Sequence, residues 1–292
     1  MEYTNLLAEY GPAMSAEEVA QVVESCREKS VRNQNKDVYK LCYSTIDLTT
    51  LTEKDSVQSV GKFVGKAVDF QSHFPEIPNV ASICVFPSFV DVVGLGVEGT
   101  DIAVTSVAGG FPASQTFVEV KMLEVSMAVE NGADEIDVVI NVGQMLEGDY
   151  EPMANEIAML REEAGEDTVF KVIIESGALQ TPELIRKASL LAMFAGADFV
   201  KTSTGKIPVA ATPEAAVVMC TAIRDYYEKT GRKVGFKAAG GIRSAEEAAL
   251  FYTIVEEILG KEWCTPALWR IGASSLANGL ISAIQGEKVA YF

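Results

Sequence analysis

The stretch Ala197-Asp198-Phe199-Val200-Lys201-Thr202-Ser203-Thr204-Gly205-Lys206, with Thr212-Pro213-Glu214 shortly after it, encodes one strand, one loop and the start of one helix. The short apolar run at 197–201 predicts a buried strand that ends in a lysine. Thr212 before Pro213 and an acidic residue is typical of a helix start, with a capping side chain and a proline in the first turn. The segment therefore predicts one complete βα unit.

The same alternation recurs along most of the chain. Two further helix starts are Thr181-Pro182-Glu183 and the capping box Ser244-Ala245-Glu246-Glu247. The near-continuous apolar character of the strands is what a parallel sheet buried on both faces requires. Eight βα units over about 250 residues favour an α/β fold of the (β/α)₈ TIM-barrel type, with a doubly wound open sheet as the alternative. The predicted strands are residues 40–46, 80–86, 102–107, 135–140, 169–174, 197–201, 233–237 and 267–271.

Residues 1–39 differ from this pattern. A capping box at Ser15 opens an amphipathic helix from Ala16 to about Arg27, and a polar connector follows at 32–37. We interpret 1–39 as an N-terminal helical extension, a helix plus linker, and 40–292 as the barrel domain with a short C-terminal tail. The extension is too short to bury a core of its own, which favours packing on the barrel over an independent module.

Composition excludes several classes of function. The 292 residues include 24 basic and 41 acidic side chains, a net charge of −17, which disfavours binding to nucleic acid or to an anionic membrane surface. No run is long enough to predict a membrane span. The five cysteines are odd in number and lack a C-x-x-C spacing, which indicates a reduced cytoplasmic chain rather than a disulfide framework or zinc site. The single histidine, His73, disfavours a site that needs several imidazole ligands.

Ionisable residues gather at the predicted strand ends, where barrel enzymes have their active sites. Lys201 and Lys237 fall on neighbouring strands, six and seven. Burial disfavours a charged lysine and a nearby second cation disfavours it further, so one amine could be neutral and nucleophilic. Asp137 could then move protons. A lone strand-end lysine is more often a solvated rim residue, and Glu135 beside Asp137 is expected in a solvated turn. Cys84, without a histidine partner, is expected to be a small buried thiol.

Three late strands are followed by small or glycine-rich loops. These are Thr204-Gly205-Lys206, Ala238-Ala239-Gly240-Gly241-Ile242-Arg243 and Gly272-Ala273-Ser274-Ser275. Glycine lets the backbone approach an anion closely, and a helix N-terminus points N–H groups at it. Barrels of this class commonly bind phosphate after strands seven and eight. The loops therefore predict a phosphate site, although ordinary βα turns also use glycine.

The strings Lys201-Thr202-Ser203-Thr204-Gly205 and Lys237-Ala238-Ala239-Gly240-Gly241, in this order, resemble the 2-deoxy-D-ribose-5-phosphate aldolase family. The resemblance covers roughly residues 40 to 285 and includes Ile46-Asp47-Leu48-Thr49-Thr50-Leu51. It implies a class I aldolase on a (β/α)₈ barrel, without metal or cofactor. The implied reaction is reversible cleavage of 2-deoxyribose 5-phosphate to acetaldehyde and glyceraldehyde 3-phosphate.

The resemblance also implies roles for individual residues. Lys201 would form the imine, Lys237 would lower its pKa, and Asp137 would join a proton relay. Tyr291, next to last in the chain, is a candidate proton shuttle on a mobile tail. The residues implied to line the substrate are Asp47, Thr49, Cys84 and Thr204, and those implied to hold the phosphate are Gly205, Lys206, Gly240, Gly241, Gly272, Ser274 and Ser275.

Two departures from the family pattern are visible. Ala238 stands where many members have proline, and the loop Gly109-Gly110-Phe111-Pro112 is not the version typical of the family. A homo-oligomer, with a dimer favoured, is expected. Two other functions stay open on the residues alone. One is a sugar-phosphate isomerase or lyase that works without an imine and uses Glu175 or Asp137 as base. The other is a non-catalytic sugar-phosphate-binding barrel.

Overall fold

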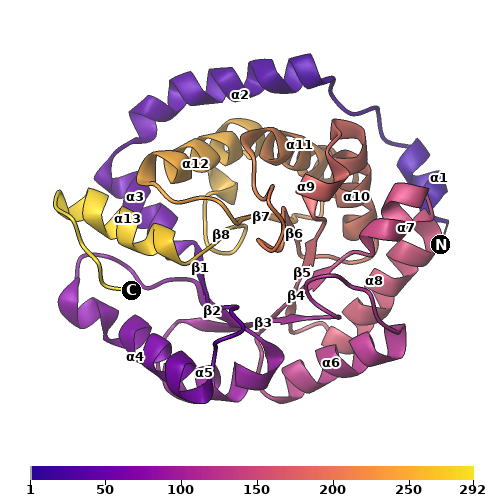
Figure 1. The fold of residues 1–292 in the computed structure, drawn as a ribbon. Coiled ribbons are helices and arrows are strands. Elements are labelled where there is room, and N and C mark those ends of the chain that lie inside the picture. Colours follow the sequence, from indigo (N-terminus) through magenta and orange to yellow (C-terminus); the bar gives the residue numbers. More distant parts are fainter. Residues whose placement is uncertain (1) are drawn as a thin grey trace.

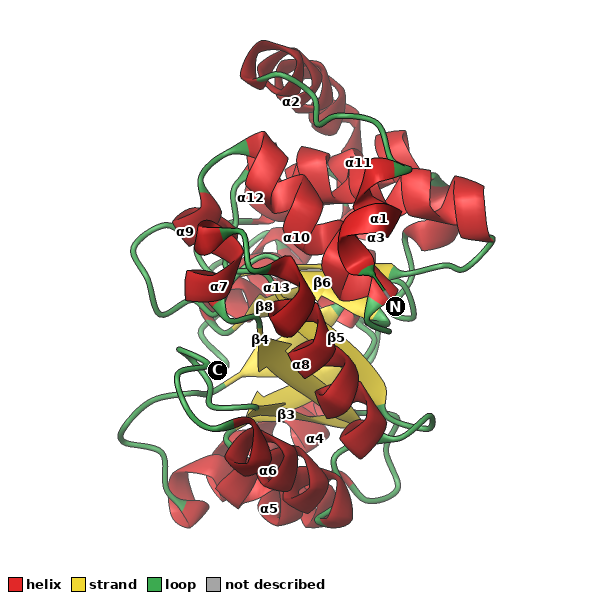
Figure 2. Ribbon diagram, turned by 90° about the vertical axis from the view of Figure 1, so that its right-hand side faces the viewer, coloured by secondary structure: helices red, strands yellow, loops and turns green. Residues whose placement is uncertain are grey.

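A computed structural model describes residues 2–292 and shows a closed barrel of eight parallel strands in the order β1 to β8 (Figures 1 and 2). Helices surround the barrel, so the predicted TIM barrel is confirmed. The strands are β1 (Ile46–Thr49), β2 (Ser82–Val85), β3 (Ala103–Ala108), β4 (Glu135–Val139), β5 (Val169–Ile173), β6 (Phe199–Lys201), β7 (Gly235–Ala239) and β8 (Trp269–Ala273).

The helices begin where the capping signals predicted. The Thr181, Thr212 and Ser244 side chains each accept a hydrogen bond from a first-turn N–H. The elements outside the strands, from β1 onward, are α4 (Val57–His73), η2 (Pro87–Phe89), α5 (Val90–Val97), α6 (Val118–Glu130), α7 (Val142–Glu147), α8 (Tyr150–Ala164), α9 (Ser176–Leu179), α10 (Pro182–Phe194), α11 (Pro213–Thr230), α12 (Ala245–Leu259), η3 (Lys261–Trp263) and α13 (Ser275–Gln285). Within residues 2–292 we find no helix with the length and apolar character to cross a membrane.

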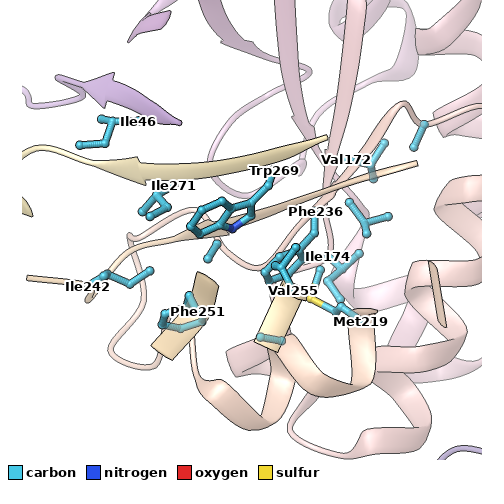
Figure 3. Close-up of a cluster of buried hydrophobic side chains, with 14 of the residues drawn as sticks. Ile46, Val172, Ile174, Met219, Phe236, Ile242, Phe251, Val255, Trp269 and Ile271 are labelled. Atoms are coloured by element: carbon cyan, nitrogen blue, oxygen red, sulfur yellow. The ribbon is translucent and has the colours of Figure 1, made fainter. Parts of the chain in front are cut away.

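The main core lies between the outer face of the barrel and the helix ring. Figure 3 shows Trp269 of β8 and Phe236 of β7 beside Val255 and Phe251 of α12. All four side chains are buried. Each strand therefore has an apolar outward face against the helices, which frees the inward face to carry charged residues.

The N-terminal residues form α1 (Tyr3–Ala8), α2 (Ala16–Ser30), η1 (Val31–Asn33) and α3 (Lys36–Ser44). The predicted capping box at Ser15 is confirmed, and α2 runs three residues beyond the predicted end at Arg27. Figure 1 shows α2 as an outer layer over α11 and α12. Its Val19, Val23 and Cys26 are buried, and Lys29 pairs with Glu257 of α12. The extension thus packs on the barrel.

The predicted first strand at 40–46 is wrong for most of its length. Residues 36–44 form α3, which Asn35 caps by accepting a hydrogen bond of 3.1 Å from the Val38 N–H. Tyr39, Cys42 and Tyr43 bury one helical face, and β1 begins only at Ile46. The boundary placed between 39 and 40 therefore falls inside a helix. A short apolar run fits a buried helix as well as a strand, and only packing decides between them.

Candidate active site

The C-terminal ends of the strands surround a cavity of about 450 Å³. Most residues expected at the substrate and phosphate sites line it together, although they come from different βα units. The expected residues found in its wall are Thr49, Lys201, Thr204, Gly205, Lys206, Gly240, Gly241, Gly272, Ser274 and Ser275.

Lys201 and Lys237 lie side by side inside the barrel and share one carboxylate. They are directly paired residues of β6 and β7. The Lys201 and Lys237 ammonium groups each donate to Oδ2 of Asp137 at 2.7 Å. Asp137 is fully buried, and both lysines are buried as well. The structure therefore brings the three expected catalytic residues together.

Three charged residues that the sequence reasoning did not assign to the site extend this cluster. Lys171 of β5 contacts Asp137 at 2.9 Å and Glu135 at 2.6 Å. Arg270 of β8 contacts Asp47 at 2.6 Å and Glu135 at 2.7 Å. The expectation that Glu135 lies in a solvated turn is wrong, because its side chain points into this buried network. A lysine within the apolar run of β5 was a usable signal, since a charge on a fully buried strand needs a partner.

The pairing within the cluster is uneven. Four cations, the three lysines and Arg270, face the three carboxylates Asp47, Glu135 and Asp137. Lys237 contacts Asp47 and Asp137, whereas Asp137 is the one carboxylate within ion-pair distance of Lys201 among the described residues. Buried charges need compensation. Lys201 is therefore the cation that loses its proton most easily.

The pKa shifts follow this pairing. Burial lowers the pKa of Lys201, Asp137 opposes the shift, and the Lys237 cation adds to it, so the pKa lies below its ordinary value. Burial also opposes the charge of Lys237, but Asp137 and Asp47 outweigh it and raise its pKa. Burial acts to raise the pKa of Asp137, and the three lysines overcome it and hold that pKa well below the ordinary value. The geometry thus favours a nucleophilic amine at Lys201 beside a permanent cation at Lys237.

The other expected substrate-lining residues lie next to this cluster. Asp47 is fully buried beside Lys237, and the Thr49 hydroxyl donates to the Asp47 carbonyl at 2.8 Å. Cys84 is also fully buried, and burial raises the pKa of its thiol. The thiol is therefore neutral near the two lysines, and neither Cys84 nor Asp47 is among the described residues that line the cavity.

The side of the cavity where the sequence predicts a phosphate consists of backbone packed closely together. Gly240 has φ +82°, and a Cβ built there would lie 2.7 Å from Ala210 Cβ. Only glycine fits such a position without strain. Within the described chain, no side chain caps the first turn of α13 after Ser274, so its N–H groups stay open at the cavity. Open helix N–H groups suit an anion. The Lys206 ammonium donates to the Leu51 carbonyl across the mouth.

Tyr291 is not brought to the cavity. Its hydroxyl donates to the Lys66 carbonyl of α4 at 2.8 Å, and its ring packs against Phe70, His73 and Phe74. These contacts hold the tyrosine on the outside of the helix ring. His73 is exposed on the same helix. Within residues 2–292, no group of three or more His, Cys, Asp or Glu side chains is arranged to hold a metal ion.

Comparisons of the sequence and of the fold with known proteins both find aldolases. The model of the DeoC/LacD family aldolases matches residues 42–279. The deoxyribose-phosphate aldolases of Mus musculus and Homo sapiens are 45% and 44% identical to the chain over 245 residues, which is 80% of this chain and 77% of each relative. The structure of the tetrameric deoxyribose phosphate aldolase of Aeropyrum pernix has the same fold, with a TM-score of 0.66 at 24% identity, covering 92% of this chain and 98% of that one.

Proposed function

The chain belongs to the DeoC/LacD aldolase family, and we propose that Lys201 is the amine that forms its Schiff base. The activity is the reversible cleavage of 2-deoxy-D-ribose 5-phosphate to acetaldehyde and D-glyceraldehyde 3-phosphate, an aldehyde-lyase reaction. The observation that supports Lys201 most directly is its single carboxylate partner beside the Lys237 cation. This arrangement leaves one neutral amine at the cavity.

In the proposed reaction, the neutral Lys201 amine attacks the aldehyde carbon of the open-chain sugar. Loss of water gives a protonated imine. Loss of the proton from the C3 hydroxyl then breaks the C2–C3 bond, releases glyceraldehyde 3-phosphate and moves the electron pair into an enamine on Lys201. Protonation of the enamine carbon and hydrolysis by water release acetaldehyde and the free amine. Asp137, 2.7 Å from the Lys201 amine, accepts and returns protons, directly or through a water. Lys237 stays charged and keeps Lys201 unprotonated between turnovers. The glycine-rich loops and the open N-terminus of α13 hold the phosphate.

An imine-free isomerase or lyase has less support. It would need Asp137 or Glu175 as a free base. Asp137 accepts hydrogen bonds from the amines of three lysines, so it serves those amines and does not stand as the single free base that such a reaction needs. Glu175 directs both carboxylate oxygens at Thr204. An imine-free reaction would also leave the lowered pKa of Lys201 without a role.

The proposed chemistry is tested on the purified wild-type chain in two assays. A coupled assay should detect glyceraldehyde 3-phosphate released from 2-deoxyribose 5-phosphate. Borohydride added with acetaldehyde should leave an ethyl group on Lys201, mapped by peptide mass spectrometry. Turnover without an adduct on Lys201 would favour the imine-free alternative, and binding of the sugar phosphate without turnover would favour a non-catalytic barrel.

We further propose that the chain forms a homodimer through one face of α6. Phe117, Val120, Leu123 and Met127, here called the α6 apolar face, are all exposed. A hollow of about 440 Å³ lies between this face and η2. Contiguous exposed apolar surface of this kind is typical of a protein interface. Since a two-fold interface buries the same patch on both subunits, one substitution changes it twice.

Leu123→Glu should therefore shift the chain from dimer to monomer, because it places a charge at the centre of the interface on each subunit. Light scattering after gel filtration measures the mass. Val31→Glu, at an exposed apolar residue outside the α6 apolar face, is the matched control and should leave the mass unchanged. A wild-type chain that is already monomeric, or a Leu123→Glu dimer, would contradict this interface.

We propose the cytoplasm as the site of action. The five cysteines all lie within the described residues, and each is buried and unpaired. Free thiols are usual in a reducing compartment.

A further inference from the structure

Glu175 is a buried carboxylate at the barrel mouth that the proposed chemistry does not use. It follows β5 and precedes the single turn of α9, with φ 50° and ψ 58°. Residues other than glycine rarely adopt this left-handed backbone conformation, so the surrounding structure must hold Glu175 in it. Its side chain is 4% exposed. A strained, buried acid close to an active site is a candidate for a specific structural task.

Both carboxylate oxygens of Glu175 accept hydrogen bonds from Thr204, the first residue of the loop Thr204-Gly205-Lys206. Oε1 accepts from the Thr204 backbone N–H at 3.2 Å, and Oε2 accepts from the Thr204 hydroxyl at 2.6 Å. The same hydroxyl accepts from the Lys206 N–H at 3.0 Å. The three residues thus form a chain of hydrogen bonds that ends in the loop Thr204-Gly205-Lys206.

This chain continues the pairing of β5 with β6 beyond the end of the sheet. The Ile174 N–H donates to the Lys201 carbonyl at 3.0 Å, and the Ser176 N–H donates to the Thr202 carbonyl at 2.8 Å. For the Thr204 N–H, the acceptor is the Glu175 carboxylate. The carboxylate therefore sets the position of the loop relative to Lys201, only three residues earlier in the chain.

The position of this loop also affects the glycine-rich loop at residues 238–243, which we propose holds the phosphate as well. A Cβ built on Gly240 would lie 3.1 Å from Gly205 Cα, so the two backbones are in close contact. The Ala211 N–H donates to the Gly240 carbonyl at 3.2 Å, which joins the loops again. Glu175 itself is not among the described residues that line the cavity. Its charge is turned toward Thr204, away from the anion that the loops would bind.

We propose that Glu175 is a positioning residue that fixes the Thr204-Gly205-Lys206 loop for the phosphate of the substrate. The inference rests on the proposed function, since it concerns the same site. Glu175 acts through Thr204 and touches neither the reacting carbonyl nor the phosphate. Its loss should therefore weaken recognition of the phosphate and leave the chemistry at Lys201 in place.

The test is Glu175→Gln, which keeps the size of the side chain but replaces one of the two acceptors by an amide NH₂. Misplacing a binding group by about 1 Å can cost up to about 100-fold, so we expect KM for 2-deoxyribose 5-phosphate to rise roughly 10- to 100-fold. The rate constant kcat/KM for unphosphorylated 2-deoxyribose should change less than about threefold. Binding of inorganic phosphate, followed by phosphorus NMR, should weaken by the same factor as KM.

Companion variants make the result specific. Thr204→Val removes the hydroxyl from the same chain and should reproduce the effect, with Thr204→Ser less impaired. Glu175→Gln combined with Thr204→Val should be little worse than either alone, because both remove one shared contact. Glu183→Gln, on the exposed first turn of α10, is the control for loss of a nearby negative charge.

The outcomes separate this inference from the proposed function. Equal losses on the phosphorylated and unphosphorylated sugars, or additive effects in the double variant, would overturn the positioning role. If Glu175→Gln does not fold, as judged by circular dichroism, Thr204→Val decides by the same measurements. A wild-type chain that gives no acetaldehyde adduct on Lys201 would refute the proposed function instead. The measurement of inorganic phosphate binding needs no turnover, so it would still test the positioning role of Glu175.

Discussion

Lys201→Leu should reduce the cleavage of 2-deoxyribose 5-phosphate by at least about 10⁴-fold, because it removes the amine that forms the covalent intermediate. The substitution leaves Asp137 paired with Lys171 and Lys237, so the buried cluster keeps its charge compensation. We therefore expect the variant to fold. The measurements are kcat/KM in the coupled assay and the borohydride-trapped adduct with acetaldehyde, both of which should be lost.

Lys201→Arg is the informative companion. It keeps a cation near Asp137 but presents a guanidinium, which stays protonated and does not form the imine. If the role of Lys201 were only to neutralise charge, the arginine variant would retain much of the activity. The Schiff-base role predicts that both variants are inactive. Full activity in Lys201→Leu, or an adduct mapped to Lys237 in the wild type, would refute the assignment.

Lys237→Leu should raise the pKa of Lys201 and lower activity at neutral pH by roughly 100-fold. At present the Lys237 cation and burial disfavour the charged form of Lys201, while Asp137 favours it. Removing Lys237 leaves Asp137 free to pair more strongly with Lys201. The reactive form is the neutral amine, so a higher pKa moves the acidic limb of the pH–rate profile to higher pH. Each unit of that rise lowers the rate tenfold below the pKa.

The pH dependence distinguishes this mechanism from simple damage to the fold. Raising the pH should restore a large part of the lost activity of Lys237→Leu, because it deprotonates Lys201 directly. Asp47 keeps Arg270 and Asp137 keeps Lys171 as partners, so we expect the destabilisation to stay below about 3 kcal/mol. Chemical denaturation measures it. A pH–rate profile with the wild-type limbs but lower amplitude would count against the role given to Lys237.

The sequence alone determined the repeating part of this protein. The strand-then-helix alternation and the caps at Thr181, Thr212 and Ser244 are local signals, readable within a few residues, and the helices begin at those places. The predicted β7 and β8 begin and end two residues too early, whereas β6 begins two residues later than predicted and ends at Lys201 as predicted. The order of Lys201 and Lys237 on adjacent strands was also readable, since it follows from counting βα units.

The tertiary structure decided what the local signals left open. Residues 40–44 are helical, and Tyr43 among them stacks on Phe70 of α4 at a ring-centroid distance of 4.7 Å, a contact that no short window contains. The partners of Lys171, Glu135 and Arg270 depend on which side chains of different strands point inward at the same height. Proton affinity depends on these long-range distances through desolvation and Coulomb interaction. The sequence could therefore place two lysines at one site, and only the closed barrel shows that Lys201, with one carboxylate partner against two for Lys237, is the amine favoured to be neutral.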